Sequence, residues 1–190
     1  MASTVHATLN ENPWQKFVDF LLRRRVRITA MIFIALVAED VVTRVQPHNL
    51  FGLSNYKVLV GLGLVFAGLA LRSWAAGTLQ KRKQLAMSGP YQLVRHPLYV
   101  GSYLMMVGFC LLVDDWDNIW VVFGPILFLY VLQAVYEEKY LAQMFPEQWT
   151  DFIRRVPRFI PRRVPTAILD DWSFAQWTKN REYQALGAAL

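Results

Sequence analysis

Cysteine is nearly absent from this chain, in which Cys110 is the single thiol among 190 residues. One thiol cannot form an internal disulfide or a cysteine-based metal site, and the apolar run around it predicts a small buried side chain. The sequence also lacks a Walker motif, a GxGxxG motif and any metal-ligand spacing. We therefore expect no bound metal and no P-loop or Rossmann nucleotide site.

Charge is scarce as well, at 18% of the residues, where a soluble domain has about a quarter. The residues before Arg23 include Glu11 and Asp19 and no sustained apolar core, so we expect no cleaved signal peptide. Hydrophobic residues instead make up 55% of the chain. This balance indicates one membrane domain over residues 1–190.

Long apolar runs account for this composition. Val58–Ala76 has one charge, whereas Pro97–Val113 and Ile119–Tyr136 have none. Each is close to the roughly 20 residues with which a helix crosses about 30 Å of hydrocarbon. A fourth run, Ile28–Val45, is interrupted by Glu39-Asp40. We predict an all-α fold, a polytopic transmembrane helix bundle of about four spans, or five if the tail adds one (28–45, 58–76, 97–113, 119–136).

Several residues inside these spans carry structural predictions. Small residues let neighbouring helices approach closely, and the second span has three of them: Gly61, Gly63 and Gly68. Gly124-Pro125 should kink the last span. Arg72 lies about one turn from the end of its span and should extend its charged end to the headgroups. Asp40 and Arg44 have the i,i+4 spacing of a helical ion pair.

Basic residues are concentrated on one side of the predicted membrane. Of the 20 lysines and arginines, 17 lie in residues 1–27, between the second and third spans, or after the fourth. The positive-inside rule then places both termini in the cytosol, and we expect a bacterial inner membrane. Topology thus explains the net charge of +6, and we expect no nucleic acid as a partner.

The first polar block, Gln80–Pro97, joins the second and third spans. Gly89-Pro90 predicts a turn, since glycine permits positive φ and proline fixes it. Pro97 suits the first turn of a helix, whose free N–H groups would form an anion site together with Arg95 and His96. A histidine at this boundary can be merely interfacial. Because Tyr91 and Tyr99 flank it, we favour a ligand site.

The second block, residues 137–163, begins at the end of the fourth span. Glu137-Glu138 precedes an amphipathic helical pattern, and a stretch rich in arginine and proline follows. One interpretation is an interfacial helix with solvated charges. The alternative is that the stretch folds back over the first block. That arrangement would form a cytosolic pocket with both signs of charge, aromatic walls and a side that faces lipid.

Together these two blocks resemble the isoprenylcysteine carboxyl methyltransferase family of integral membrane enzymes, which also includes phospholipid methyltransferases. The resemblance rests on GPY-x-x-x-RHP-x-Y-x-G (Gly89–Gly101) and on the downstream EE…RVP…P, and covers roughly residues 71–163. Family members usually have Phe-Gly followed by two tyrosines. This chain has Phe145-Pro146, then Trp149 and Phe152, so both hydroxyls are missing.

The resemblance implies S-adenosylmethionine (SAM) as the methyl donor and no metal. His96 and the helix start would hold its carboxylate, Tyr91 and Tyr99 would contact the ribose and adenine, and Glu137 and Glu138 would accept from the ammonium or ribose. The full predicted set of cofactor-binding residues is Tyr91, Val94, Arg95, His96, Pro97, Tyr99, Gly101, Glu137 and Glu138.

The methyl acceptor implied by the resemblance is a lipophilic molecule that enters from the bilayer and its lipids. A carboxylate acceptor would need only orientation, for which Arg155 is the predicted clamp. An amine or phenol acceptor would need a general base, for which Glu138 is the candidate. The sequence leaves carboxylate, amine and thiol acceptors open.

Two other functions fit parts of the sequence. A membrane reductase of the sterol-reductase type would use NADPH, with Arg154, Arg155 and Arg158 near the 2′-phosphate. A non-catalytic membrane protein would make His96 and the acidic pair incidental. The tail, residues 164–190, lies outside the resemblance, and we predict an interfacial helix because its apolar ALGAAL is too short to cross a bilayer.

Overall fold

The computed structural model describes residues 13–44, 55–80, 84–113, 116–162 and 171–189. These residues form helices and turns and contain no strand, which confirms the predicted all-α class. The helices are α1 (Pro13–Thr43), α2 (Tyr56–Thr78), α3 (Pro97–Val113), α4 (Trp116–Val121), α5 (Leu127–Met144), α6 (Pro146–Arg155), α7 (Phe174–Lys179) and α8 (Glu182–Ala189).

Two helices of the described chain are long and apolar enough to cross a membrane. They are α2 and the continuous helix Asn118–Met144, which α4 and α5 form together. Helix α3 is equally apolar but has 17 residues. The predicted span 28–45 falls on α1 up to Thr43, while residue 45 lies outside the described residues. The predicted number of four spans therefore stays a prediction.

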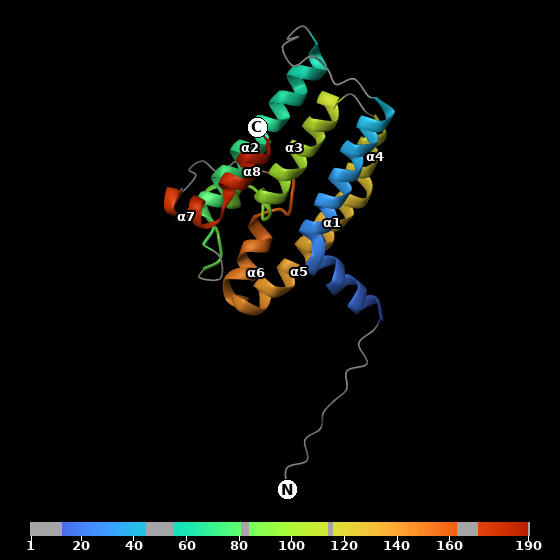
Figure 1. Cartoon of the computed structure of the whole chain (residues 1–190). Coiled ribbons are helices and arrows are strands. Elements are labelled where there is room, and N and C mark those ends of the chain that lie inside the picture. Colours follow the sequence, from blue (N-terminus) through green and yellow to red (C-terminus); the bar gives the residue numbers. More distant parts are fainter. Residues whose placement is uncertain (1–12, 45–54, 81–83, 114–115, 163–170, 190) are drawn as a thin grey trace.

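Figure 1 shows how the helices are arranged. Helices α2 and α3 lie side by side, and α1 runs along the α4–α5 helix. Helix α6 turns back at the end of α5, and the short helices α7 and α8 lie against one end of α2. The polar blocks of the sequence are therefore gathered at the end of the bundle where α2 ends and α3 begins.

Glycines bring α2 and α3 into close contact. A Cβ at Gly108 of α3 would lie 2.7 Å from the carbonyl oxygen of Gly61, and one at Gly101 would lie 2.7 Å from that of Gly68. Around these pairs, α2 and α3 bury Val58, Val65, Leu69 and Leu112. The prediction of close approach is confirmed for Gly61 and Gly68. It is wrong for Gly63, where a Cβ would meet no atom of another element within 4 Å among the described residues.

The α4–α5 helix has an irregular turn at Gly124-Pro125, where the sequence predicted a kink. Residues Val122–Ile126 form a π turn, because Pro125 cannot donate a backbone hydrogen bond. The amide of Leu127 donates to the carbonyls of Val122 and Gly124. One helical turn earlier, the buried Asn118 donates to Asp40 of α1 at 3.0 and 3.2 Å. This contact gives the carboxylate of Asp40 a structural role.

Arg72 is positioned differently from the prediction that its side chain extends to the headgroups. Its guanidinium donates to both carboxylate oxygens of Glu182 in α8, at 2.8 and 3.1 Å, and also to the hydroxyl of Ser102 in α3. The prediction was wrong because a carboxylate 110 positions away in the sequence lies close enough to pair with it.

Two glycine-to-alanine variants test the close packing of α2 against α3. Gly108→Ala should destabilise the protein by about 1–3 kcal/mol, because the new methyl group meets backbone that cannot move aside cheaply. Gly63→Ala should be neutral or stabilising, since alanine favours helix and the site is open. Thermal unfolding of both variants in detergent measures the difference. Equal unfolding temperatures would contradict the packing described.

Candidate functional site

The loop between α2 and α3 presents its polar residues through two backbone features. Gly89 has a φ of 56°, which allows residues Gly89–Gln92 to form a 3-10 turn. Helix α3 then begins at Pro97, and the carbonyl of His96 accepts from the amides of Tyr99 and Val100, each at 3.1 Å. Both features match the sequence predictions, and they place Tyr91, His96 and Tyr99 around one helix start.

The segment after α6 folds back against this helix start. The amide of Arg95 donates to the carbonyl of Pro157 at 2.9 Å, and that of His96 to the carbonyl of Arg158 at 3.3 Å. The fold-back is held by a buried apolar cluster with four members: Leu85, Trp149, Phe152 and Val156. The predicted return of the second block is therefore confirmed. Trp149 and Phe152 serve as core residues.

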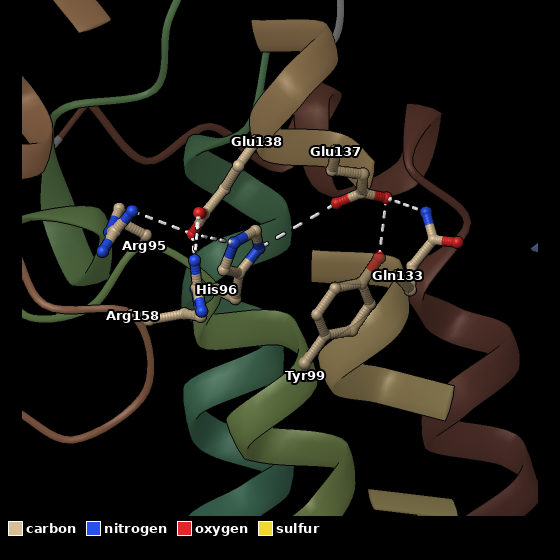
Figure 2. A network of polar contacts seen from close by, with 7 residues as sticks. All are labelled: Arg95, His96, Tyr99, Gln133, Glu137, Glu138 and Arg158. Atoms are coloured by element: carbon tan, nitrogen blue, oxygen red, sulfur yellow. Dashed lines mark hydrogen bonds and ion pairs between the residues drawn. The ribbon is translucent and has the colours of Figure 1, made fainter. Parts of the chain in front are cut away.

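Glu138 of α5 is the centre of the polar network in Figure 2. Arg158 binds both of its carboxylate oxygens, with Nε at 2.9 Å from Oε1 and Nη2 at 2.6 Å from Oε2. Arg95 Nη1 lies 2.9 Å from Oε1, and His96 Nε2 lies 3.2 Å from the same oxygen. The Glu138 side chain is only 10% exposed and that of His96 only 6%. A buried carboxylate is thus surrounded by cationic and N–H donors.

Glu137, the preceding residue, belongs to a second set of contacts. Its Oε1 accepts from the hydroxyl of Tyr99 at 2.6 Å and from the amide of Gln133 at 2.8 Å. Its Oε2 lies 3.9 Å from Nδ1 of His96, so the imidazole is placed between the two glutamates (Figure 2). The ring of His96 also stacks on that of Tyr99, with centroids 5.5 Å apart.

Burial and charge shift three ionisable groups of the loops. Burial lowers the pKa of the Arg95 guanidinium, and Glu138 opposes that effect. Hydrogen bonds to Glu138 raise the pKa of Arg158. Burial, assisted by the negative charge of Glu137, raises the pKa of Tyr91. Tyr91 therefore keeps its proton at neutral pH and offers an uncharged hydroxyl.

A cavity of about 510 Å³ lies beside this network. This volume is within the range of small-molecule sites, roughly 300–1,000 Å³. Its polar lining residues are Gln80, Gln84, Tyr91, Arg95, His96, Tyr99 and Glu137. Its apolar lining residues include Leu79, Leu85, Leu98, Leu141, Met144, Phe145 and Phe152. A molecule with charged and aromatic parts fits such a mixed lining.

The structure brings most of the predicted site residues to the cavity. Six of them line it: Tyr91, Arg95, His96, Pro97, Tyr99 and Glu137. Glu138 contacts two of them, Arg95 and His96, and Val94 is buried. Gly101 lies at the contact of α2 with α3, where a Cβ would be 2.6 Å from Cγ of Arg72. Arg155 is exposed on the last turn of α6.

Two residues of the network were not predicted for it. Gln133 precedes Glu137 by one helical turn and is an amide within an apolar run, a signal visible in the sequence. Arg158 was considered only as a contact for NADPH, although it lies three residues after the predicted clamp Arg155. Helical order ends at Arg155, so Arg158 is on the extended segment that returns to α3.

The burial of Glu138 generates a stability prediction. Glu138→Gln should lower the free energy of unfolding by about 3 kcal/mol, because Arg95 and Arg158 lose the charge that compensates them. Glu147→Gln on the exposed face of α6 is the control and should change stability little. Thermal unfolding in detergent is the measurement. A Glu138→Gln protein as stable as the control would remove Glu138 from the centre of the site.

Comparisons with known proteins bear on this site. The profile of the phospholipid methyltransferase family matches residues 56–148, from the start of α2 into α6. The match therefore includes Arg95, His96, Glu137 and Glu138 and ends before Arg158. No solved structure matches the chain.

The similar proteins include metal-resistance proteins and methyltransferases. The cobalt-zinc-cadmium resistance protein CzcN of Cupriavidus metallidurans is 32% identical over 154 residues, which cover 76% of this chain and 67% of that protein. The nickel-cobalt-cadmium resistance protein NccN of Alcaligenes xylosoxydans is 30% identical over 76% of this chain and 68% of its own length. Protein-S-isoprenylcysteine O-methyltransferase B of Arabidopsis thaliana is 27% identical over 53% of this chain and 57% of that enzyme. The chain belongs to the membrane-bound methyltransferase family that includes the phospholipid and isoprenylcysteine methyltransferases.

Proposed function

We propose that this protein transfers a methyl group from SAM to a lipophilic acceptor at the cytosolic face of a membrane. The observation that carries the proposal is the cavity of about 510 Å³ between the RHP helix start and the α5–α6 corner. Its lining combines a carboxylate, hydroxyls and a cation with apolar side chains. Membership of a methyltransferase family supports the same reaction.

The chemistry of the cavity wall fits SAM. The cofactor carries an ammonium, a carboxylate and an adenosine, and it supplies an electrophilic methyl group on a positively charged sulfur. Glu137 lines the cavity and would accept from the ammonium, while Tyr91 and Tyr99 offer hydroxyls and ring faces to the adenosine. Within the described residues, the buried Nε–H of Arg95 has no acceptor. An unpaired buried donor is costly, and a cofactor carboxylate would satisfy it.

The two neighbouring glutamates would have different roles. Both oxygens of Glu138 already accept from Arg158, and Oε1 is also contacted by Arg95 and His96. We therefore assign Glu138 to positioning, because it holds two wall residues and the return segment in place. Glu137 faces the ligand. Methyl transfer is an in-line displacement, so such positioning and the exclusion of water would supply most of the rate.

The acceptor would approach along α5. Tyr136, Tyr140 and Met144 are spaced one helical turn apart and are all exposed, and the latter two line the cavity or its rim. This apolar row leads from the membrane-length part of the helix to the site. A lipid chain would lie on it with its reactive headgroup in the cavity. Carboxylate, amine and thiol headgroups all remain compatible with the wall.

The distribution of basic residues supports a membrane topology for this protein. The 17 basic residues on one side support a multi-pass protein with both termini in the cytosol, and two relatives are bacterial proteins, which supports a bacterial inner membrane. The NADPH alternative loses part of its basis, since Arg158 is bound to Glu138. Arg154 and Arg155 alone are left for a 2′-phosphate.

Binding of SAM is the first test. The purified full chain should be stabilised by SAM or by its demethylated product and not by NADPH, as measured by thermal shift. Glu137→Gln should weaken SAM binding about tenfold or more, since a hydrogen bond to a charged group contributes roughly 1.5–3 kcal/mol. His96→Ala should abolish binding, whereas Glu147→Gln should leave it unchanged. Stabilisation by NADPH alone would favour the reductase.

Transfer itself is tested with a labelled methyl group. Membrane extracts from the source organism, separated into lipid and protein, should yield a labelled product only with active protein. Its mass would identify the acceptor class. Met144→Glu should reduce transfer to that acceptor, because a charge on the apolar row disfavours a lipid chain, while SAM binding persists. Product formation in neither extract would contradict a lipophilic acceptor.

A further inference from the structure

The end of α2 is completed by a distant part of the chain. The last carbonyls of a helix have no intrahelical partner, and here residues 171–189, the C-terminal segment, supply donors. Asn180 Nδ2 donates to the carbonyls of Ala76 and Leu79 at 2.7 and 2.9 Å, and Gln176 Nε2 to that of Leu79 at 2.6 Å. The amide of Ser173 donates to the carbonyl of Gly77 at 3.0 Å.

Side-chain packing fixes the same contact. The indole of Trp172 lies against Gly77, and Nε1 donates to the carbonyl of Ser73 at 3.2 Å. A Cβ at Gly77 would overlap that indole. The residue at this position must therefore be glycine for the C-terminal segment to lie where it does.

An ion pair anchors the segment more deeply. Glu182 of α8 is 4% exposed, and a carboxylate that is buried to this extent requires a partner. Arg72 supplies it through two hydrogen bonds and also donates to Ser102 of α3. The pair therefore connects α8 to both α2 and α3, one turn below the glycine contact of Gly68 with Gly101.

This anchor reaches the wall of the cavity. Leu79, whose carbonyl accepts from Gln176 and Asn180, lines the cavity together with Gln80. Tyr91 also lines it, and the turn Gly89–Gln92 that carries Tyr91 packs against α2. These three lining residues, called the wall below, therefore lie close to the C-terminal segment.

We propose that the C-terminal segment positions this wall for the cofactor, and that Glu182, through Arg72, is its principal positioning residue. The inference rests on the proposed function for the identity of the ligand, SAM. Glu182 itself does not line the cavity. It acts by holding the end of α2 and the turn that carries Tyr91, so that the methyl donor meets a preformed surface.

The test compares Glu182→Gln with Asp171→Asn, an exposed carboxylate of the same segment. Both variants are made in the full chain and studied in detergent. Backbone hydrogen exchange of residues 79–80 and 84–96, without ligand, reports the order of the wall. Equilibrium binding reports SAM affinity. We expect Glu182→Gln to exchange faster at these residues and to bind SAM about tenfold more weakly, as misplaced contacts do, while Asp171→Asn matches the wild type.

A second variant guards against a general loss of folding. Gln176→Ala combined with Asn180→Ala removes the side-chain bonds to Leu79 and leaves the buried ion pair intact. It should also speed exchange at residues 79–80 and weaken SAM binding. If Glu182→Gln fails to fold, this double variant decides the question.

The outcomes separate the two proposals. A lower unfolding temperature with unchanged exchange in the wall and unchanged SAM affinity would overturn the positioning role, leaving the segment as a structural brace. If Glu182→Gln exchanges faster in the wall but the wild-type protein binds no SAM, the positioning of the wall is supported and SAM is overturned as its ligand. If the wild type binds SAM and both variants bind it with the same affinity, the positioning role is overturned and SAM binding is not.

Discussion

A carboxylate buried at the end of an apolar helix constrains the rest of this structure. Removing the charge of Glu138 from water is costly unless donors surround it, and the donors that contact it lie on other segments. The donors come from Arg95 and His96 before α3 and from Arg158 after α6. Three segments must therefore meet for the protein to fold, and their meeting place is one wall of the cavity.

A second buried carboxylate anchors the C-terminal segment beside α2. Glu182 pairs with Arg72, and the distance between α2 and α3 on which this pair depends is set by the glycines that let the two backbones touch. The candidate site thus lies between two ionic anchors on a tightly packed helix pair. Such an arrangement favours a preorganised site, because each wall is held by groups that have no other way to satisfy their charge.

Particular residues show how far sequence reasoning reached. The start of α3 at Pro97, the turn at Gly89, the π turn around Pro125 and the fold-back of the second block follow from local chemistry, since proline and glycine restrict or free the backbone wherever they occur. The roles of Glu137 and Glu138 do not follow from local chemistry. Consecutive residues on a helix point about 100° apart, so only the rotation of α5 decides which of them faces the cavity.

The sequence by itself determined the helices, their apolar runs, the two polar blocks and the family that these blocks indicate, because these properties depend on residues near one another in the chain. The tertiary structure decided which distant residues contact one another. Arg158 meets Glu138, Arg72 meets Glu182, and Gly101 packs on α2 while Pro97 and Tyr99 line the cavity. Such pairings depend on which surfaces distant segments present to one another, and local spacing carries no information about that.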